Sequence, residues 1–134
     1  MRGRQRGQTL VLAAMVIAFL FIPLGIYVID SGLVEASYSQ LSETLQASAE
    51  DGASMIDQSA YRESGAKTIV LDPALARETA DRSMRISRIP GLQSWSVQTN
   101  GRTVTVTAHL RVVLFGTGAV TLSESRSARL AYGQ

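Results

Sequence analysis

The feature that most constrains this chain is an uninterrupted apolar run near its beginning, from Leu10 to Ile29. At a helical rise of 1.5 Å per residue, such a run spans about 30 Å, which is the thickness of the hydrocarbon core of a bilayer. No residue from Gly7 to Ile29 carries a charge. The sequence therefore predicts a transmembrane helix over residues 10–29.

Two other interpretations compete with a membrane span. A secretory signal peptide has an apolar region of only about 7 to 15 residues followed by a small-residue cleavage site. The best cleavage candidate here is Val34-Glu35-Ala36, which lies beyond Asp30 and inside a helical pattern. A buried core helix would carry a polar stripe, whereas this run is apolar all round. We therefore favour a span that is not removed.

The charges on either side of the run predict its orientation. Three arginines precede it, the last being Arg6, and no Lys or Arg follows until Arg62. The positive-inside rule places residues 1–9 in the cytoplasm as a basic segment and the rest of the chain outside the cell membrane. Asp30 marks the outer boundary, because a carboxylate costs roughly 2.5 to 3.5 kcal/mol at a helix centre and much less at its end.

Pro23 lies inside the predicted span. A proline removes one intrahelical hydrogen bond and tends to kink a helix, which membrane helices tolerate when neighbouring groups satisfy the freed carbonyl. We expect a kink at Pro23, which is either harmless or a bend that a packed assembly requires.

Beyond Asp30 the sequence predicts that the helix continues over residues 30–61 outside the membrane. Span and continuation together make one helix of about fifty residues, too long for an ordinary globular helix. Apolar and small residues recur in it at alternating spacings of four and three, which is typical of a heptad seam. The seam consists of Val34, Tyr38, Leu41, Leu45, Ser48, Gly52, Met55 and Ser59. We favour packing of this seam against the chain's own C-terminal domain over packing against a helix of another subunit, and both remain open.

Residues 62–134 are expected to form a small α+β domain. After a loop over 62–72, with a short strand at 68–71, Asp72-Pro73 has the pattern of a helix N-cap and first helical residue. This helix should end near Ile89, before Pro90-Gly91.

From Ser94 the apolar period changes to two, which indicates strands. Asn100-Gly101 is a hairpin signal, so we expect antiparallel strands near 94–99, 102–115 and 119–130. On the middle strand five apolar side chains should face the core, namely Val104, Val106, Ala108, Leu110 and Val112. The predicted fold class is therefore α+β: a long N-terminal transmembrane helix that continues outside the membrane, a second short helix and a three-stranded antiparallel sheet.

Composition argues against catalysis, cofactors and nucleic acid. The chain has no cysteine and one histidine, so it offers neither a disulfide nor a clustered zinc site. His109 falls on the polar face of the middle strand, and no motif of a known catalytic constellation is present. The basic residues are scattered among acids and form no stripe for nucleic acid. We expect a protein that is not an enzyme, with no catalytic, cofactor or metal site.

Several N-terminal motifs in order carry a family resemblance: "RGQTL", the apolar run with Pro23, "VIDSG", and the small-residue stretch "SAEDGASM". Residues 6–56 resemble the N-terminal region of the TadE/TadG-like proteins of Tad (Flp) pilus assembly. The resemblance implies a pilin-like, single-pass structural component, similar to a minor pilin or pseudopilin. Its expected partners are other pilus or secretion-system subunits, or a second copy of itself through the helix.

One position departs from that family. TadE-like members resemble prepilins, which are cut after a glycine and carry Glu at the fifth residue beyond it. Counted from Gly7, that residue is Leu12. We therefore expect no cleavage after Gly7 and a TadG-like anchor. The alternative function is a signal-anchored extracytoplasmic binding domain, for which the helix is only a stalk.

Overall fold

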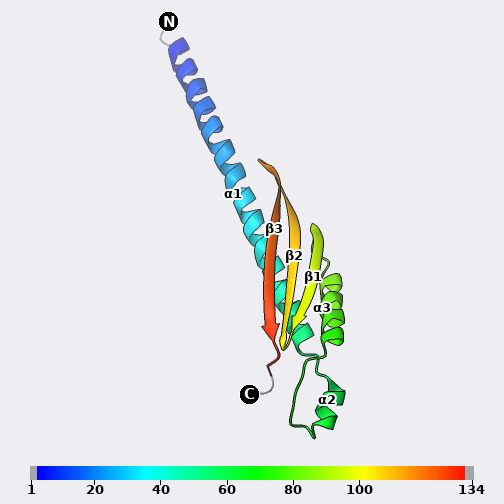
Figure 1. The fold of residues 1–134 in the computed structure, drawn as a ribbon. Helices are drawn as coiled ribbons and strands as arrows, with labels where there is room; N and C mark the ends of the chain where they lie inside the picture. The colour runs from blue at the N-terminus through cyan, green and yellow to red at the C-terminus, as the bar shows by residue number, and fades with distance from the viewer. Residues whose placement is uncertain (1–2, 132–134) are drawn as a thin grey trace.

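The computed structural model describes the backbone of residues 3–131 and the side chains of residues 7–131, so that Arg2 and Tyr132 lie outside it. Its elements are α1 (Gly3–Ala53), α2 (Gln58–Glu63), α3 (Pro73–Ser87), β1 (Leu92–Asn100), β2 (Thr103–Leu114) and β3 (Gly118–Arg129) (Figure 1). The predicted α+β layout of a long apolar helix, a short helix and a three-stranded antiparallel sheet is confirmed.

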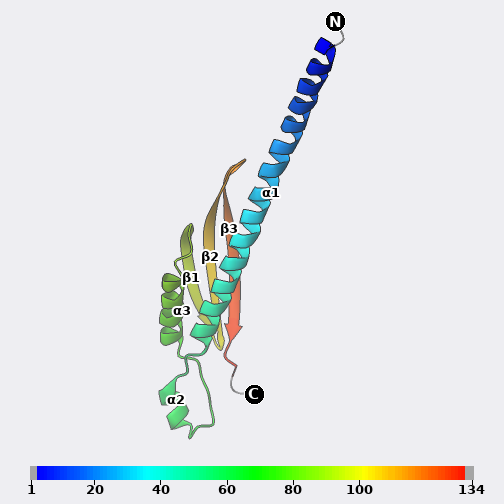
Figure 2. The ribbon, with the colours of Figure 1, turned by 180° about the vertical axis from the view of Figure 1, so that it is seen from behind.

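α1 is one continuous helix of 51 residues. Its N-terminal part stands clear of the rest of the molecule, and its C-terminal part lies along the sheet (Figures 1 and 2). The helix also runs through Pro23 without a sharp bend in either view. The expected kink is therefore not seen in either view.

α1 ends at Ala53, so the prediction of one continuous helix over 30–61 is wrong: residues 54–57 are not helical, and residues 58–61 belong to the separate helix α2. The backbone at 55–57 pairs instead with the backbone at 70–72, through hydrogen bonds of 2.8 and 3.1 Å. This pairing uses amides and carbonyls that a longer helix would need. Asp57 then caps α2, where its side chain accepts hydrogen bonds from the first turn.

The structure also differs from the loop that was predicted over 62–72. Its first residues belong to α2, and the short strand expected at 68–71 is reduced to an isolated bridge between Ile56 and Leu71. A single bridge leaves most of this segment to be held by turns rather than by a sheet.

α3 begins as predicted, with Pro73 at the first position and the Asp72 carboxylate accepting from the Ala74 and Leu75 amides, both at 3.0 Å. It ends at Ser87 rather than near Ile89, because Arg88 adopts a left-handed conformation with φ of 45°. Pro90-Gly91 then leads into β1.

The sheet has the order β1-β2-β3, and both pairs are antiparallel. The strands begin and end within two residues of the predicted positions. A two-residue turn at Gly101 and Arg102 joins β1 to β2, because Asn100 is already paired with Thr103. The turn predicted at Asn100-Gly101 is therefore displaced by one residue, and Gly101 takes a positive φ of 58° at its first position.

One face of the sheet is the core and the other is polar. Core residues of β2, α3 and the outer part of α1 form a single buried cluster, which includes the five predicted core side chains of β2. The opposite face of β2 and β3 carries paired hydroxyls, such as Thr105 Oγ1 with Ser127 Oγ at 2.8 Å and Thr107 Oγ1 with Ser125 Oγ at 3.0 Å. Residues from both predicted segments, 30–61 and 62–134, therefore share one core.

Candidate functional site at the membrane boundary

The free part of α1 is the part of the chain that could cross a membrane. Every residue from Leu10 to Ile29 is exposed except Ile26, which is half-buried. Phe19 keeps 87% of its surface exposed. Within residues 3–131, α1 alone is long and apolar enough to span a bilayer. Such a continuous apolar surface requires a cover of lipid or protein.

The predicted N-terminal boundary residues lie at the free end of this helix. Arg6 and Gly7 belong to the first turns of α1, which begins inside the predicted segment 1–9. A Cβ atom at Gly7 would meet nothing within 4 Å, so the structure gives this glycine no packing role.

Asp30 ends the exposed apolar surface and holds the tip of the β2–β3 hairpin. Only 8% of its surface is exposed. Its Oδ1 accepts a hydrogen bond from the Phe115 amide at 2.8 Å, and its Oδ2 accepts one from the Gly116 amide at 2.9 Å. Hydrogen bonds to a charged acceptor are among the stronger ones in proteins. The sequence predicted Asp30 as a boundary residue but gave no signal for this contact.

The turn that Asp30 holds packs directly on α1. A Cβ atom at Gly116 would lie 2.8 Å from Cγ2 of Ile26 and 3.1 Å from Oδ2 of Asp30, so a larger residue would push the turn away. Ile26 lies one helical turn nearer the N-terminus than Asp30. The hairpin tip is therefore level with the last turn of the apolar run.

A second polar contact joins α1 to β3. The Tyr38 hydroxyl donates to Oε2 of Glu124 at 2.9 Å, and Nη2 of Arg126 lies 2.9 Å from Oε1 of the same carboxylate. The hydrogen bond to Glu124 raises the pKa of Tyr38, because it favours the neutral hydroxyl over the phenolate. Sequence analysis missed Glu124 and Arg126, because charged residues at alternate positions of a strand usually indicate a solvent-facing side.

A groove of about 460 Å³ lies between these two contacts, along the outer end of the apolar run. Its walls come from α1 and the hairpin: Tyr27, Asp30, Ser31, Val34, Glu35, Tyr38, Leu114 and Thr117. Two aromatic rings and two aliphatic side chains make it mostly apolar, with carboxylates at two points. It lies close to where a membrane surface would lie.

The predicted seam is divided between the core and the surface. Leu41 and Leu45 are fully buried in the chain's own core, and Ser48 is equally buried. At Gly52, a Cβ atom would lie 2.9 Å from the carbonyl oxygen of Ala76. The small-residue half of the seam therefore lets α3 approach the α1 backbone.

The ends of the seam lie elsewhere. Val34 is half-buried and Tyr38 is 41% exposed, both beside the groove. Met55 follows the end of α1, and Ser59 is an exposed residue of α2. The structure therefore uses the middle of the seam internally and leaves its membrane end open for further contacts.

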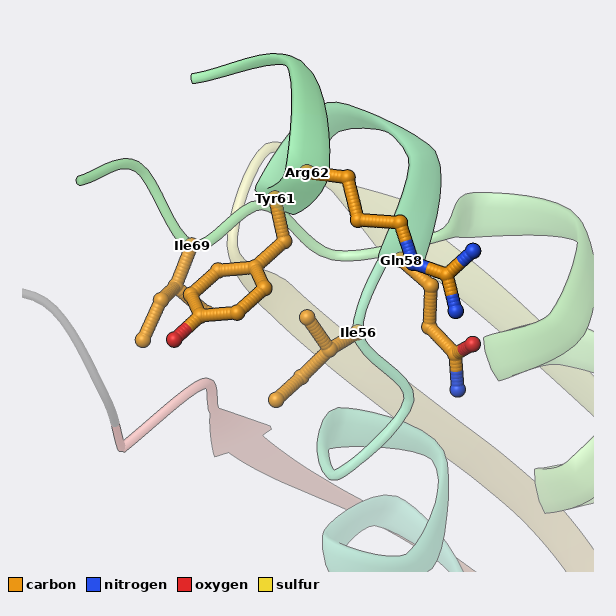
Figure 3. A pocket seen from close by; sticks show the side chains of 5 residues that line it. All are labelled: Ile56, Gln58, Tyr61, Arg62 and Ile69. Carbon is orange, nitrogen blue, oxygen red and sulfur yellow. The ribbon is translucent and has the colours of Figure 1, made fainter. Parts of the chain in front are cut away.

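A second hollow, of about 560 Å³, lies at α2, the end of the molecule farthest from the apolar run (Figures 1 and 3). The Tyr61 ring lies beside Ile69 and faces Ile56, while Gln58 and Arg62 lie together on the other side. Asp57 fixes the start of α2, and hydrogen bonds from the Ser59 hydroxyl and the Ala60 amide lower its pKa.

The ionisable side chains show no metal-binding arrangement. No group of three or more His, Asp or Glu side chains that could hold a metal occurs in the described part of the chain. His109 lies on the exposed face of β2, with Nδ1 2.7 Å from the Ser123 hydroxyl.

No protein-family model, curated protein or solved structure matches this chain significantly. The TadE/TadG-like resemblance of residues 6–56 therefore stays a prediction.

Proposed function

We propose that this protein is a membrane-anchored structural or assembly component of a Tad/Flp-type pilus or a related secretion system, TadE/TadG-like and comparable to a minor pilin or pseudopilin. The observation that carries the proposal is α1 itself. One helix of 51 residues joins an exposed apolar segment to an outer segment that forms part of a small α+β core. The same helix can therefore hold the domain at a membrane and set its orientation.

In this proposal the N-terminus is cytoplasmic and the α+β domain lies outside the cell membrane, as the arginine asymmetry predicts. The partners are the lipid bilayer and other pilus or secretion-system subunits. An anchor confines the domain to a layer at a defined height, where its effective concentration for other anchored subunits far exceeds that of a free domain.

Deletion of the gene tests the proposal, with surface filaments as the readout. We expect deletion to abolish or strongly reduce filaments and the full chain to restore them. A version in which a cleavable signal peptide replaces residues 1–25 keeps Ile26 and Asp30 for the hairpin, so its domain should still fold. It should fail to restore filaments when exported in equal amount.

One control makes this result interpretable. A chain with an unrelated apolar helix of equal length in place of residues 10–25 tests whether anchoring alone is sufficient. Rescue by the soluble version would show that the anchor is not needed. Normal filaments in the deletion strain would contradict the pilus assignment altogether.

The second candidate is a signal-anchored binding domain in which the helix serves as a stalk. The hollow at Tyr61 favours it, because that surface lies at the end of the domain farthest from the span. Under this alternative, Tyr61→Ala should remove function while changes on the membrane side of α1 have no effect. Neighbouring genes for a secretion ATPase and a polytopic platform protein would favour the pilus role.

A further inference from the structure

We propose that the tip of the β2–β3 hairpin enters the outer leaflet of the membrane beside the span, as a second point of contact with lipid. The inference rests on the proposed anchor and adds to it a site in the extracytoplasmic domain. The occupant of this surface is the lipid bilayer itself.

The first argument is position. Asp30 binds the Phe115 and Gly116 amides, and Gly116 lies against Ile26. Ile26 is four residues on the membrane side of Asp30, which is about 6 Å along a helix. If residues 10–29 cross the bilayer, the turn is held at the depth of their last turn. Figure 1 shows this tip reaching farther along α1 than β1 or α3 does.

The second argument is chemistry. Residues 112–123 carry no charge, and they include every residue of the turn. Val113 is on the face of β2 that points away from the core, and Phe115 follows β2 in the turn. Their surfaces are 71% and 80% exposed. Neither side chain is covered by the chain, so apolar surface at the tip is left open.

The charged residues begin where the lipid headgroups would be. Arg111 is exposed and lies on the same strand face as Val113, two residues or about 7 Å farther from the tip. A basic side chain at that depth can extend to anionic headgroups. Tyr27 is 70% exposed on the span and is the neighbour of Ile26, so it lies level with the turn itself. Aromatic rings are enriched at membrane interfaces.

The third argument concerns the backbone. Polar groups of the main chain are costly in an apolar medium unless they are hydrogen-bonded. Up to Leu114, β2 is paired in register with β3, which begins at Gly118. The amides of Phe115 and Gly116 lie beyond that pairing, and the Asp30 carboxylate accepts both. Asp30 therefore satisfies two of the donors that would otherwise oppose entry of the turn.

Nitroxide labels on single cysteines in the full chain test this inference, because the native sequence has no cysteine. The protein is reconstituted in vesicles of phosphatidylethanolamine and phosphatidylglycerol. Collisions of each label with oxygen, which concentrates in lipid, are compared with collisions with a water-soluble nickel chelate. The variants are Phe115→Cys at the tip, Ile17→Cys in the span, and Ile86→Cys on α3. Ile86 is the matched control, because it is 71% exposed and lies away from the hairpin tip.

We expect the label at position 115 to collide more with oxygen than with the chelate, as at position 17, and the label at 86 to show the reverse. A label at 115 that behaves like the one at 86 would place the tip in water and overturn the inference. Shielding at 115 from both reagents would also overturn it, because a protein surface such as a second copy would then cover the tip. Chelate access at 17 would refute the anchor instead, so the two failures are distinguishable.

Discussion

Gly52 is the position where the packing of α1 on α3 can be tested with the smallest possible change. Gly52→Ala adds one methyl group where a Cβ atom would lie 2.9 Å from the Ala76 carbonyl oxygen and 3.1 Å from Cγ1 of Val104. The methyl would also lie 3.2 Å from Cβ of Ala80. The closest of these atoms belongs to backbone and cannot rotate away, so the two helices must separate.

Two opposing effects decide the result. Replacement of a helical glycine by alanine stabilises a helix by up to about 1 kcal/mol, and by less near its end, where Gly52 lies. Overpacking a core of this density costs roughly 1 to 3 kcal/mol. We therefore expect Gly52→Ala to lower the free energy of unfolding by roughly 1 to 2 kcal/mol.

The control is Gly32→Ala, the same chemical change in the same helix. A Cβ atom at Gly32 would meet nothing within 4 Å, so this variant should be neutral or slightly stabilised. Both variants are measured as full chains in detergent micelles by denaturant unfolding, with the fluorescence of Trp95 as the signal. Trp95 is the only tryptophan and its Nε1 donates to Asp81 of α3 at 2.8 Å. A Gly52→Ala protein as stable as the Gly32→Ala protein would refute the close approach of the helices.

Four further outcomes follow from single residues. Leu41→Asp should lower the free energy of unfolding by roughly 3 kcal/mol or more, because it places a carboxylate in a fully buried apolar site; an unchanged denaturation curve would contradict this packing. The pKa of Asp57 in the folded chain lies below its ordinary value of 3.8. The Asp57 carboxylate should therefore stabilise α2 fully above pH 3.8, and this stabilisation should be lost as the pH falls through the lower pKa of the folded chain. Asp57→Ser keeps a capping oxygen and should remove this dependence from an acid titration of α2 amide signals; an unchanged titration would argue against the cap. Lys67→Cys places a thiol on an exposed loop, and it should react with a membrane-impermeant thiol reagent added outside the inner membrane. Labelling only after that membrane is broken would reverse the proposed topology. Intact mass should show that residues up to Gly7 are retained, and a mature chain beginning at Gln8 would show that a prepilin-type peptidase acts here.

The sequence by itself determined the elements whose signals are local. A charge-free run of bilayer length predicts a long helix because every backbone group in such a segment must be satisfied within it. The pair Asp72-Pro73 predicts a helix start, since the carboxylate accepts from the first amides and proline needs no partner there. Alternation along β2 identifies the core face, because successive side chains of a strand point to opposite sides.

Only the tertiary structure decided what covers those faces. The heptad pattern of α1 shows which side is apolar, and it is compatible both with a partner subunit and with the chain's own C-terminal domain. The structure places Leu41 and Leu45 in the internal core. It also ends α1 at Ala53, because the backbone at 55–57 finds partners at 70–72 that no local pattern specifies.

Asp30 shows the same division most clearly. Its place after the apolar run predicts the outer boundary from local sequence, because a charge is least costly at the end of a span. Its two hydrogen bonds reach amides 85 and 86 residues away. No periodicity connects positions so far apart, so the attachment of the hairpin to the helix depends on how the completed sheet lies along α1.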